Sequence, residues 1–265
     1  MIINIIIPVF NRLKDTQNII EDLRNQTTDE RLEIYVINDG SSDGTAKWLQ
    51  NQQDINVLNG NGFLYWAGAV NKAIKYILEK DNNNMDDWII LLNNDISIAP
   101  NYIDNLLKVG INFSPAAVGS VIKNKYFKKL ISIGPKLLPW SLVVDDLINK
   151  NFIENKKELF MNVDALSGRG VLFPIKSLIE TNGLKPFLIP HYFADYELSI
   201  RVKKKGYKLI ITQKSVVYSA EDFGQVIKKR KKDSLFFKLF SRKSSYLFYS
   251  KFFFWWIASN NIQRL

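Results

Sequence analysis

Residues 33–45 read EIYVINDGSSDGT, a mostly apolar run that is followed at once by turn-forming residues. Residues 33–37 have the length and β-branched content of a strand buried on both faces of a parallel sheet. The polar segment Asn38-Asp39-Gly40 ends this strand, and a helix is predicted at residues 46–52. This strand–turn–helix unit predicts an α/β fold.

The same pattern continues on both sides of that unit. We predict strands at residues 2–9, 56–58 and 88–92, and helices at residues 11–25 and 67–79. The regular alternation of strands and helices predicts a parallel sheet with helices on both faces.

Beyond residue 100 the predicted elements become shorter and less regular. Helices are predicted at residues 102–109, 175–181 and 192–205, and short strands at 118–123, 130–133, 143–145, 163–166, 170–173, 208–212 and 216–218. We therefore expect one mixed sheet, mostly parallel and flanked by helices, within a single domain at residues 1–225.

Composition excludes several kinds of site. The chain has no cysteine, so it has neither a disulfide framework nor a thiolate nucleophile. Its single histidine, His191, excludes a multi-histidine metal site. No phosphate-binding loop of the G-x-x-x-x-G-K-[ST] type is present, and the glycines at residues 60–62 do not fit a dinucleotide fingerprint. These gaps leave a sugar nucleotide or a similar diphosphate as the expected ligand.

The positive charge is concentrated at the C-terminal end. The chain carries a net charge of +10, and residues 226–265 contain ten Lys and Arg against one acidic residue, Asp233. The same segment is rich in aromatic residues. We predict a helical basic extension that contacts an anionic membrane surface or a second copy of the chain. Packing of these helices back onto the domain is the alternative.

The N-terminal residues are mostly apolar but lack the basic region and cleavage site of a signal peptide. No window reaches about 18 uninterrupted apolar residues, as a membrane-spanning helix would require. We therefore expect a cytoplasmic protein, peripheral at most on the inner face of the plasma membrane.

Polar residues follow three of the predicted strands. The strands end in Pro8-Val9-Phe10-Asn11, Asn38-Asp39-Gly40 and Asn93-Asn94-Asp95. Ligands of open α/β sheets bind beyond the carboxyl ends of the strands. Carboxylates that meet there repel one another, and a divalent cation on a diphosphate would relieve that repulsion. Ordinary turn formation is the alternative, because Asn, Asp and Gly also make turns.

Five segments together resemble family 2 glycosyltransferases. These segments are residues 5–12 (IIIPVFNR), 36–45 (VINDGSSDGT), 91–95 (LLNND), 166–170 (LSGRG) and 195–201 (DYELSIR). The resemblance covers about residues 2–220 and is closest to the rhamnosyltransferase type. It implies an inverting enzyme with the GT-A fold, a nucleoside diphosphate sugar donor and a Mg²⁺ or Mn²⁺ cofactor.

The resemblance also implies roles for individual residues. Asp195 would be the general base, and Asp95 would coordinate the cation. The residues implied in nucleotide-sugar binding are Pro8, Phe10, Asn11, Asp39, Asn71, Asn93 and Asn94. His191, four residues before Asp195, is either a further metal ligand or active-site hydrogen-bonding group, or a residue that packs at the start of a helix.

Four further positions lie near the implied site. Asn93 stands where the family often has the first Asp of an Asp-x-Asp motif, so the cation would meet less negative charge. Glu197 is the second candidate for the base, but two residues along a helix place it on another face. Tyr65 and Trp66 either stack on the donor or pack in the core.

The expected function is a single sugar transfer to a glycan or lipid-linked acceptor, in the assembly of bacterial surface polysaccharide. The chain lacks the Gln-x-x-Arg-Trp motif of the processive synthases. The alternatives are a sugar-nucleotide pyrophosphorylase, whose Gly-rich activating loop is missing, and a membrane-binding or nucleic-acid-binding module that uses the basic segment. No nucleic-acid partner is expected under the first interpretation, and a homo-oligomer is left open.

Overall fold

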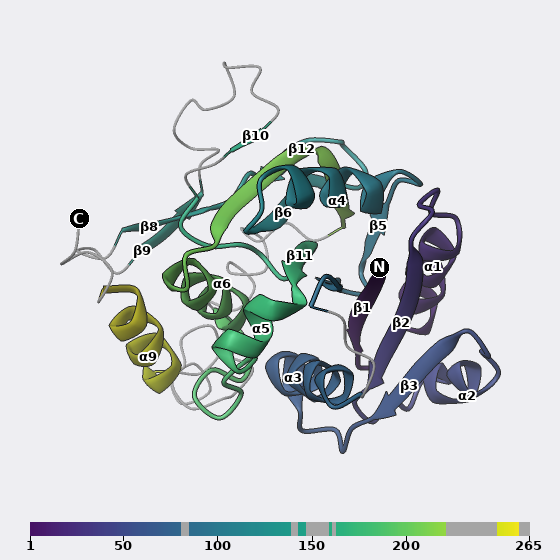
Figure 1. The fold of residues 1–265 in the computed structure, drawn as a ribbon. Coiled ribbons are helices and arrows are strands. Elements are labelled where there is room, and N and C mark those ends of the chain that lie inside the picture. The colour runs from purple at the N-terminus through teal and green to yellow at the C-terminus, as the bar shows by residue number, and fades with distance from the viewer. Residues whose placement is uncertain (81–84, 139–142, 147–158, 161–162, 221–247, 260–265) are drawn as a thin grey trace.

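The computed structural model describes residues 1–80, 85–138, 143–146, 159–160, 163–220 and 248–259 (Figure 1). In this part of the chain a curled mixed sheet is flanked by helices, with strand order β10-β12-β6-β11-β4-β1-β2-β3. Two short strands lie off this path, because β5 pairs with β12 and β7 pairs with β6. A separate hairpin is formed by β8 and β9. The predicted α/β class is confirmed.

The elements have the following bounds. The strands of the sheet are β1 (Ile2–Val9), β2 (Arg31–Asn38), β3 (Ile55–Asn59), β4 (Trp88–Leu91), β5 (Ile96–Ile98), β6 (Ala116–Asn124), β7 (Leu130–Ser132), β10 (Leu159–Phe160), β11 (Val171–Pro174) and β12 (Lys208–Ser219). The hairpin consists of β8 (Pro135–Leu138) and β9 (Val143–Asp146). The helices are α1 (Leu13–Arg24), α2 (Thr45–Gln50), α3 (Tyr65–Leu78), α4 (Tyr102–Asn112), α5 (Ile175–Thr181), α6 (Ala194–Lys204) and α9 (Phe248–Ser259).

The N-terminal half has the predicted order of strands and helices. β1 pairs in parallel with β2 on one side and with β4 on the other. Val9 lies opposite Asn38, and Ile6 lies opposite Leu91. The carboxyl ends of the three strands therefore meet at one edge of the sheet, and the polar residues that follow them are neighbours.

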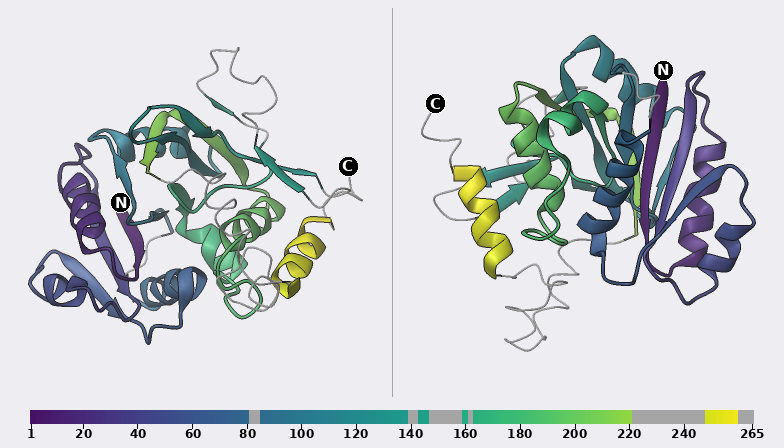
Figure 2. Two further views of the ribbon diagram at one scale, coloured as in Figure 1. Left: turned by 180° about the vertical axis from the view of Figure 1, so that it is seen from behind. Right: turned by 60° about the horizontal axis from the view of Figure 1, so that its bottom comes forward.

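Alternate residues of the central strands enter two separate cores. In β2, Ile34 and Val36 pack with α1, α2 and α4, whereas Tyr35 and Ile37 pack on the other face with α3, α5 and α6. Figure 2 shows α1 and α2 on one side of β1 and β2, and α3 on the other. Burial on both faces explains why the strands are almost continuously apolar.

The second half departs from the prediction at several strands. Residues 163–166 form no strand, although Val163, Ala165 and Leu166 are fully buried. The backbone N–H of Leu166 instead donates to Ser199 Oγ at 2.9 Å. The two predicted strands at 208–212 and 216–218 are one continuous strand, β12, whose register against β6 shifts between Thr212 and Val216. The short strands β5, β8 and β10 were not predicted.

The helix α9 packs back onto the domain beside α6 (Figures 1 and 2). Phe254 is fully buried, and its ring stacks on that of Phe193 with centroids 4.8 Å apart. Trp255 and Ala258 are also buried, while Phe252 and Trp256 are exposed. Within the described ranges, none of the helices has the length and apolar character needed to cross a bilayer. The basic residues at 228–243, within the predicted basic extension, lie outside the described residues.

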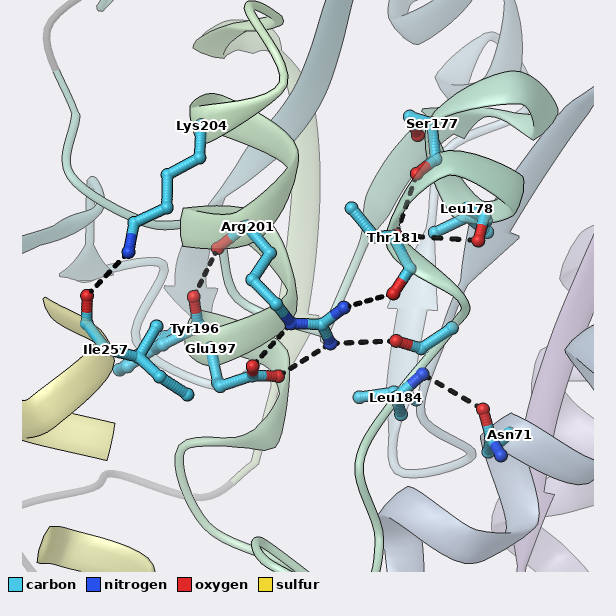
Figure 3. Close-up of polar contacts among 12 residues, drawn as sticks. Asn71, Ser177, Leu178, Thr181, Leu184, Tyr196, Glu197, Arg201, Lys204 and Ile257 are labelled. Atoms are coloured by element: carbon cyan, nitrogen blue, oxygen red, sulfur yellow. Dashed lines mark hydrogen bonds and ion pairs between the residues drawn. The ribbon is translucent and has the colours of Figure 1, made fainter. Parts of the chain in front are cut away.

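A buried ion pair fixes α6 against the end of α5 (Figure 3). Glu197 is only 1 % exposed, and its carboxylate accepts hydrogen bonds from Arg201 one turn along the same helix. The Arg201 guanidinium also donates to the backbone carbonyls of Thr181 and Gly183, the latter at 2.7 Å. One side chain therefore neutralises a buried charge and joins α6 to the segment after α5.

We expect Arg201→Met to lower the free energy of unfolding by about 3–5 kcal/mol, because it leaves the Glu197 carboxylate buried without its cation. Urea denaturation followed by circular dichroism measures the change. Lys176→Met is the matched control, because Lys176 and Glu180 form an ion pair of the same i,i+4 spacing on the surface. The control is expected to cost less than about 1 kcal/mol, and equal losses in the two variants would contradict the argument.

Candidate active site

The residues after β1 order the loop after β2. Asn11 has a left-handed backbone, with φ 59°. Its N–H donates to Ser41 Oγ at 2.8 Å, and its Oδ1 accepts from the N–H of Ser42 at 2.8 Å. Pro8, predicted to line the nucleotide pocket, is half-buried within β1. Phe10 is 51 % exposed at this edge, so its ring is accessible to a ligand.

Asp39 caps α3 from a distant part of the chain. Its carboxylate accepts hydrogen bonds from the N–H groups of Gly62 at 2.8 Å, Leu64 at 3.0 Å and Tyr65 at 3.1 Å. The side chain is buried, and its negative charge lies at the N-terminal end of α3, where it is stabilised by the helix dipole. A hydrogen bond from a nucleotide base, as predicted, would be a fourth hydrogen bond accepted by this carboxylate.

Asp95 lies beyond β4, and within the described part of the chain only one of its two carboxylate oxygens has a hydrogen-bond partner. Its Oδ2 accepts a hydrogen bond from Arg12 Nη1 at 2.7 Å. Its Oδ1 is buried and has no hydrogen-bond partner among the described residues. A buried carboxylate oxygen without a partner fits a cation ligand. The pair borders a cavity of about 270 Å³ that is also lined by Asp15, Lys125 and Tyr126.

The two asparagines before Asp95 face different ways. Asn93 Oδ1 accepts a hydrogen bond from Trp66 Nε1 at 3.0 Å. The buried Asn94 donates to Thr16 Oγ1 of α1 at 3.1 Å. Asn93 therefore contacts α3, whereas Asn94 holds the loop after β4 against α1.

Asp195 lies in the first turn of α6. Its Oδ2 accepts from the N–H of Gly168 at 2.8 Å, and its Oδ1 accepts from its neighbour Tyr196 at 3.0 Å. Burial raises the pKa of the Asp195 carboxyl above its usual value, against the lowering effect of these two hydrogen bonds. The nearby Glu197 is committed to its ion pair with Arg201, so Asp195 is the better candidate for a proton acceptor.

Two further predicted residues make contacts within the protein. The buried Asn71 of α3 accepts a hydrogen bond from the backbone N–H of Leu184 at 2.9 Å, as Figure 3 shows. The His191 ring is half-buried and packs edge to face on Tyr192, with centroids 4.7 Å apart. In the described part of the chain, no cluster of three or more His, Asp or Glu side chains gathers as a metal site. The structure thus gives Asn71 a contact that holds the segment before α6.

The first turn of α3 contacts Asp39 and the neighbours of the other two predicted carboxylates, Asp95 and Asp195. Asp39 binds the N–H of Tyr65, and the next residue, Trp66, bonds to Asn93, two residues before Asp95. The edge of the Trp66 ring also lies against Gly168, whose N–H donates to Asp195. Segments that are far apart in sequence therefore meet at the first turn of α3.

Sequence reasoning left Trp66 undecided and missed Arg12. Trp66 follows a glycine turn, and that position alone does not distinguish packing from function. Arg12 directly follows the β1 motif, and β1 is the neighbour of β4, which precedes Asp95. The adjacency of β1 and β4, which was not predicted from the sequence, brings the two charges together.

Comparison with solved structures shows the same fold. GalNAc-T7, crystallised with UDP, GalNAc and Mn²⁺, has a TM-score of 0.66 and 14 % identity over 82 % of this chain and 43 % of that chain. TarS of S. aureus (residues 1–349) in complex with UDP-GlcNAc has a TM-score of 0.60 and 13 % identity, over 83 % of this chain and 58 % of that chain. The chain thus spans about half the length of these proteins. A search of curated protein sequences found no match.

The family comparison is more direct. The model of glycosyl transferase family 2 matches residues 4–169, well over half of the chain. This range contains the ends of β1, β2 and β4, and with them Asp39 and Asp95. With the fold, the strand-end residues and the family match in agreement, the chain belongs to glycosyl transferase family 2.

Proposed function

We propose that the protein is an inverting transferase of the hexosyl or rhamnosyl type, which moves one sugar from a nucleoside diphosphate sugar to a hydroxyl of a glycan or lipid-linked acceptor. Assembly of a bacterial surface polysaccharide is the process in which we place it. The observation that carries the proposal is the contact of α3's first turn with Asp39, with the Asp95 loop and with the Asp195 segment. A donor bound there would meet a nucleotide-binding edge, a diphosphate site and a base.

Asp195 would take the proton of the acceptor. The acceptor oxygen attacks the anomeric carbon while the bond from that carbon to the diphosphate oxygen breaks. The electron pair of that bond leaves with the diphosphate, and the acceptor proton passes to the Asp195 carboxylate. A single displacement of this kind inverts the anomeric configuration and needs no covalent intermediate.

Asp95 would hold a divalent cation together with phosphate oxygens of the donor. Mg²⁺ is commonly bound by one or two carboxylates and substrate phosphates, and Asp95 Oδ1 is the buried oxygen that fits this use. A bound Mg²⁺ or Mn²⁺ would supply positive charge for the leaving diphosphate. GalNAc-T7 was crystallised with Mn²⁺. The role of His191 as an additional ligand remains a prediction.

The nucleotide would lie along the edge formed by β1 and β2. Phe10 is exposed enough to stack on the nucleotide base. The Asp39 carboxylate can accept hydrogen bonds beyond those it already makes, and one of these would come from the base. Pro8 and Asn11 would shape this edge, Asn11 through its bonds to the loop at residues 41–42.

Asn71 is hydrogen-bonded to Leu184, and Asn94 is hydrogen-bonded to Thr16. We therefore propose that both asparagines position the segments of the site and do not contact the donor.

We expect a sugar nucleotide to raise the melting temperature only when Mn²⁺ or Mg²⁺ is present, because ligand and cation share the site at Asp95. A thermal-shift screen of UDP-, GDP- and dTDP-sugars with and without Mn²⁺ measures this. Asp95→Asn should abolish the cation-dependent shift. Asp54→Asn, a surface variant near Arg24, should retain it. A shift of equal size in metal chelator would contradict the proposed cation site.

We expect Asp195→Asn to lower kcat by about 10²–10⁴ while donor binding is retained, because the amide cannot accept the acceptor's proton. Turnover of the donor identified by the screen and its Kd by calorimetry are the two measurements. Asp54→Asn again serves as the control, with unchanged turnover. Undiminished kcat in Asp195→Asn would remove this residue from the role of base.

The pH profile provides a second readout of the same base. Asp195 must be ionised to accept a proton, so kcat/KM falls as the pH drops through its pKa. Burial raises this pKa. The fall of kcat/KM on the acid side of the profile is therefore expected at a higher pH than the ordinary pKa of an aspartate, about 3.9. A fall at or below that value would argue against a buried Asp195 as the titrating group.

We also propose that the outer face of α9 contacts an anionic membrane. Phe252 and Trp256 lie one turn apart and are 59 % and 56 % exposed, on the side opposite the buried Phe254. Aromatic side chains of this kind favour the membrane interface, and the sequence around α9 is strongly basic. This arrangement would bring the protein to lipid-linked acceptors on the inner face of the plasma membrane.

We expect the double variant Phe252→Ser/Trp256→Ser to bind vesicles of phosphatidylglycerol and phosphatidylcholine at least about tenfold more weakly, because it lacks the two exposed aromatic side chains that would enter the membrane interface. Co-sedimentation measures the partition coefficient. Phe127→Ser, an exposed aromatic outside α9, is the control and should bind normally. Unchanged vesicle binding, or a change of oligomeric state in size-exclusion chromatography, would favour a contact between copies of the chain instead.

A further inference from the structure

We propose that Trp66 contacts the transferred sugar and helps to select it, an inference that rests on the proposed transferase function. The side chain lies in the first turn of α3 and is partly exposed. It contacts both the loop that carries Asp95 and the segment that orients Asp195. Three observations carry this assignment.

The first observation is a directed hydrogen bond. Trp66 Nε1 donates to Asn93 Oδ1 at 3.0 Å. An indole N–H that is removed from water needs an acceptor, and Asn93 supplies it from the end of β4. The bond fixes the orientation of the ring, and it gives Asn93 a use that does not require the charge of an aspartate.

The second observation is the close approach of the ring to Gly168. A Cβ added at Gly168 would lie 2.7 Å from Trp66 Cη2 and 3.2 Å from Asp195 Cβ, and it would overlap Trp66 Cζ2 as well. A residue with any side chain would therefore push the indole or the base away. The edge of the ring is thus held by Asn93 at one point and by the Gly168 backbone at the other.

The third observation is that Trp66 as a residue is only partly buried. It packs against the core on the α3 side of the sheet but is not fully enclosed by it. A large aromatic residue that is fixed at its ring edge and not fully enclosed is suited to binding a ligand.

The position of the ring indicates which part of the donor it would meet. In the proposed reaction the diphosphate lies at Asp95 and the acceptor oxygen lies at Asp195, so the sugar must lie between them. Trp66 touches the neighbours of both carboxylates, Asn93 and Gly168. The face of an indole is electron-rich, and it attracts the polarised C–H groups of a pyranose face. The expected ligand class is therefore a hexopyranose with an uninterrupted C–H face.

The test compares sugar nucleotides with the corresponding sugar-free nucleotides. Calorimetry measures the Kd of UDP, GDP and dTDP and of UDP-glucose, UDP-N-acetylglucosamine, GDP-mannose and dTDP-rhamnose, each with Mn²⁺. For Trp66→Leu we expect the Kd of the matching nucleoside diphosphate to stay within about twofold of wild type. The Kd of the bound sugar nucleotide should rise about three- to tenfold, because the contact between the ring and the sugar is lost.

Matched variants separate contact with the sugar from indirect effects. Trp66→Phe keeps an aromatic face but loses the N–H, so it should retain most of the sugar-dependent affinity if the ring face makes the contact. Trp48→Leu removes a partly buried tryptophan from the opposite core and should change neither Kd. Nucleoside diphosphate binding in each variant also reports that the protein is folded.

Two results would overturn the inference while leaving the proposed function intact. One is an equal loss of affinity for the nucleoside diphosphate and its sugar conjugate in Trp66→Leu, and the other is no loss for either. A wild-type protein that binds none of the sugar nucleotides would instead refute the proposed function, and with it the role of Trp66.

Discussion

The capping of α3 by Asp39 is the interaction on which the arrangement of the site depends. One carboxylate just after β2 accepts hydrogen bonds from three N–H donors, those of Gly62, Leu64 and Tyr65, at and just before the start of a helix more than twenty residues further along the chain. A buried helix start with unpaired N–H groups would be costly, so this contact determines where the helix begins. The position of Trp66, and through it the spacing between the Asp95 loop and the Asp195 segment, follows from that start.

A second constraint acts from the other side of the site. The Glu197–Arg201 pair and the bond from Leu184 to Asn71 fix α6 relative to the end of α5 and to α3 (Figure 3). Asp195 lies two residues before Glu197, so its carboxylate takes its position from this network. The proposed base is thus positioned by a helix that is linked, through the segment after α5, to the helix that carries Trp66.

The local pattern of apolar residues was sufficient to predict the strands of the central sheet. It was not sufficient to predict which polar groups contact one another. The strands β1, β2 and β4 were predictable because burial on both faces makes them continuously apolar. The same rule failed at residues 163–166, where Leu166 is equally apolar but its N–H bonds to Ser199. The contacts of Asp39 with Tyr65, of Asp95 with Arg12 and of Asn93 with Trp66 join distant segments. No periodicity in the sequence reports which distant group will satisfy a buried polar atom.

The ion pair between Arg12 and Asp95 has a thermodynamic consequence for ligand binding. A guanidinium already compensates the carboxylate, so a divalent ion that arrives alone meets a like charge beside its ligand. A diphosphate brings enough negative charge to accommodate both cations. Under the proposed function, metal and donor should therefore bind synergistically, each increasing the affinity of the protein for the other by the same factor.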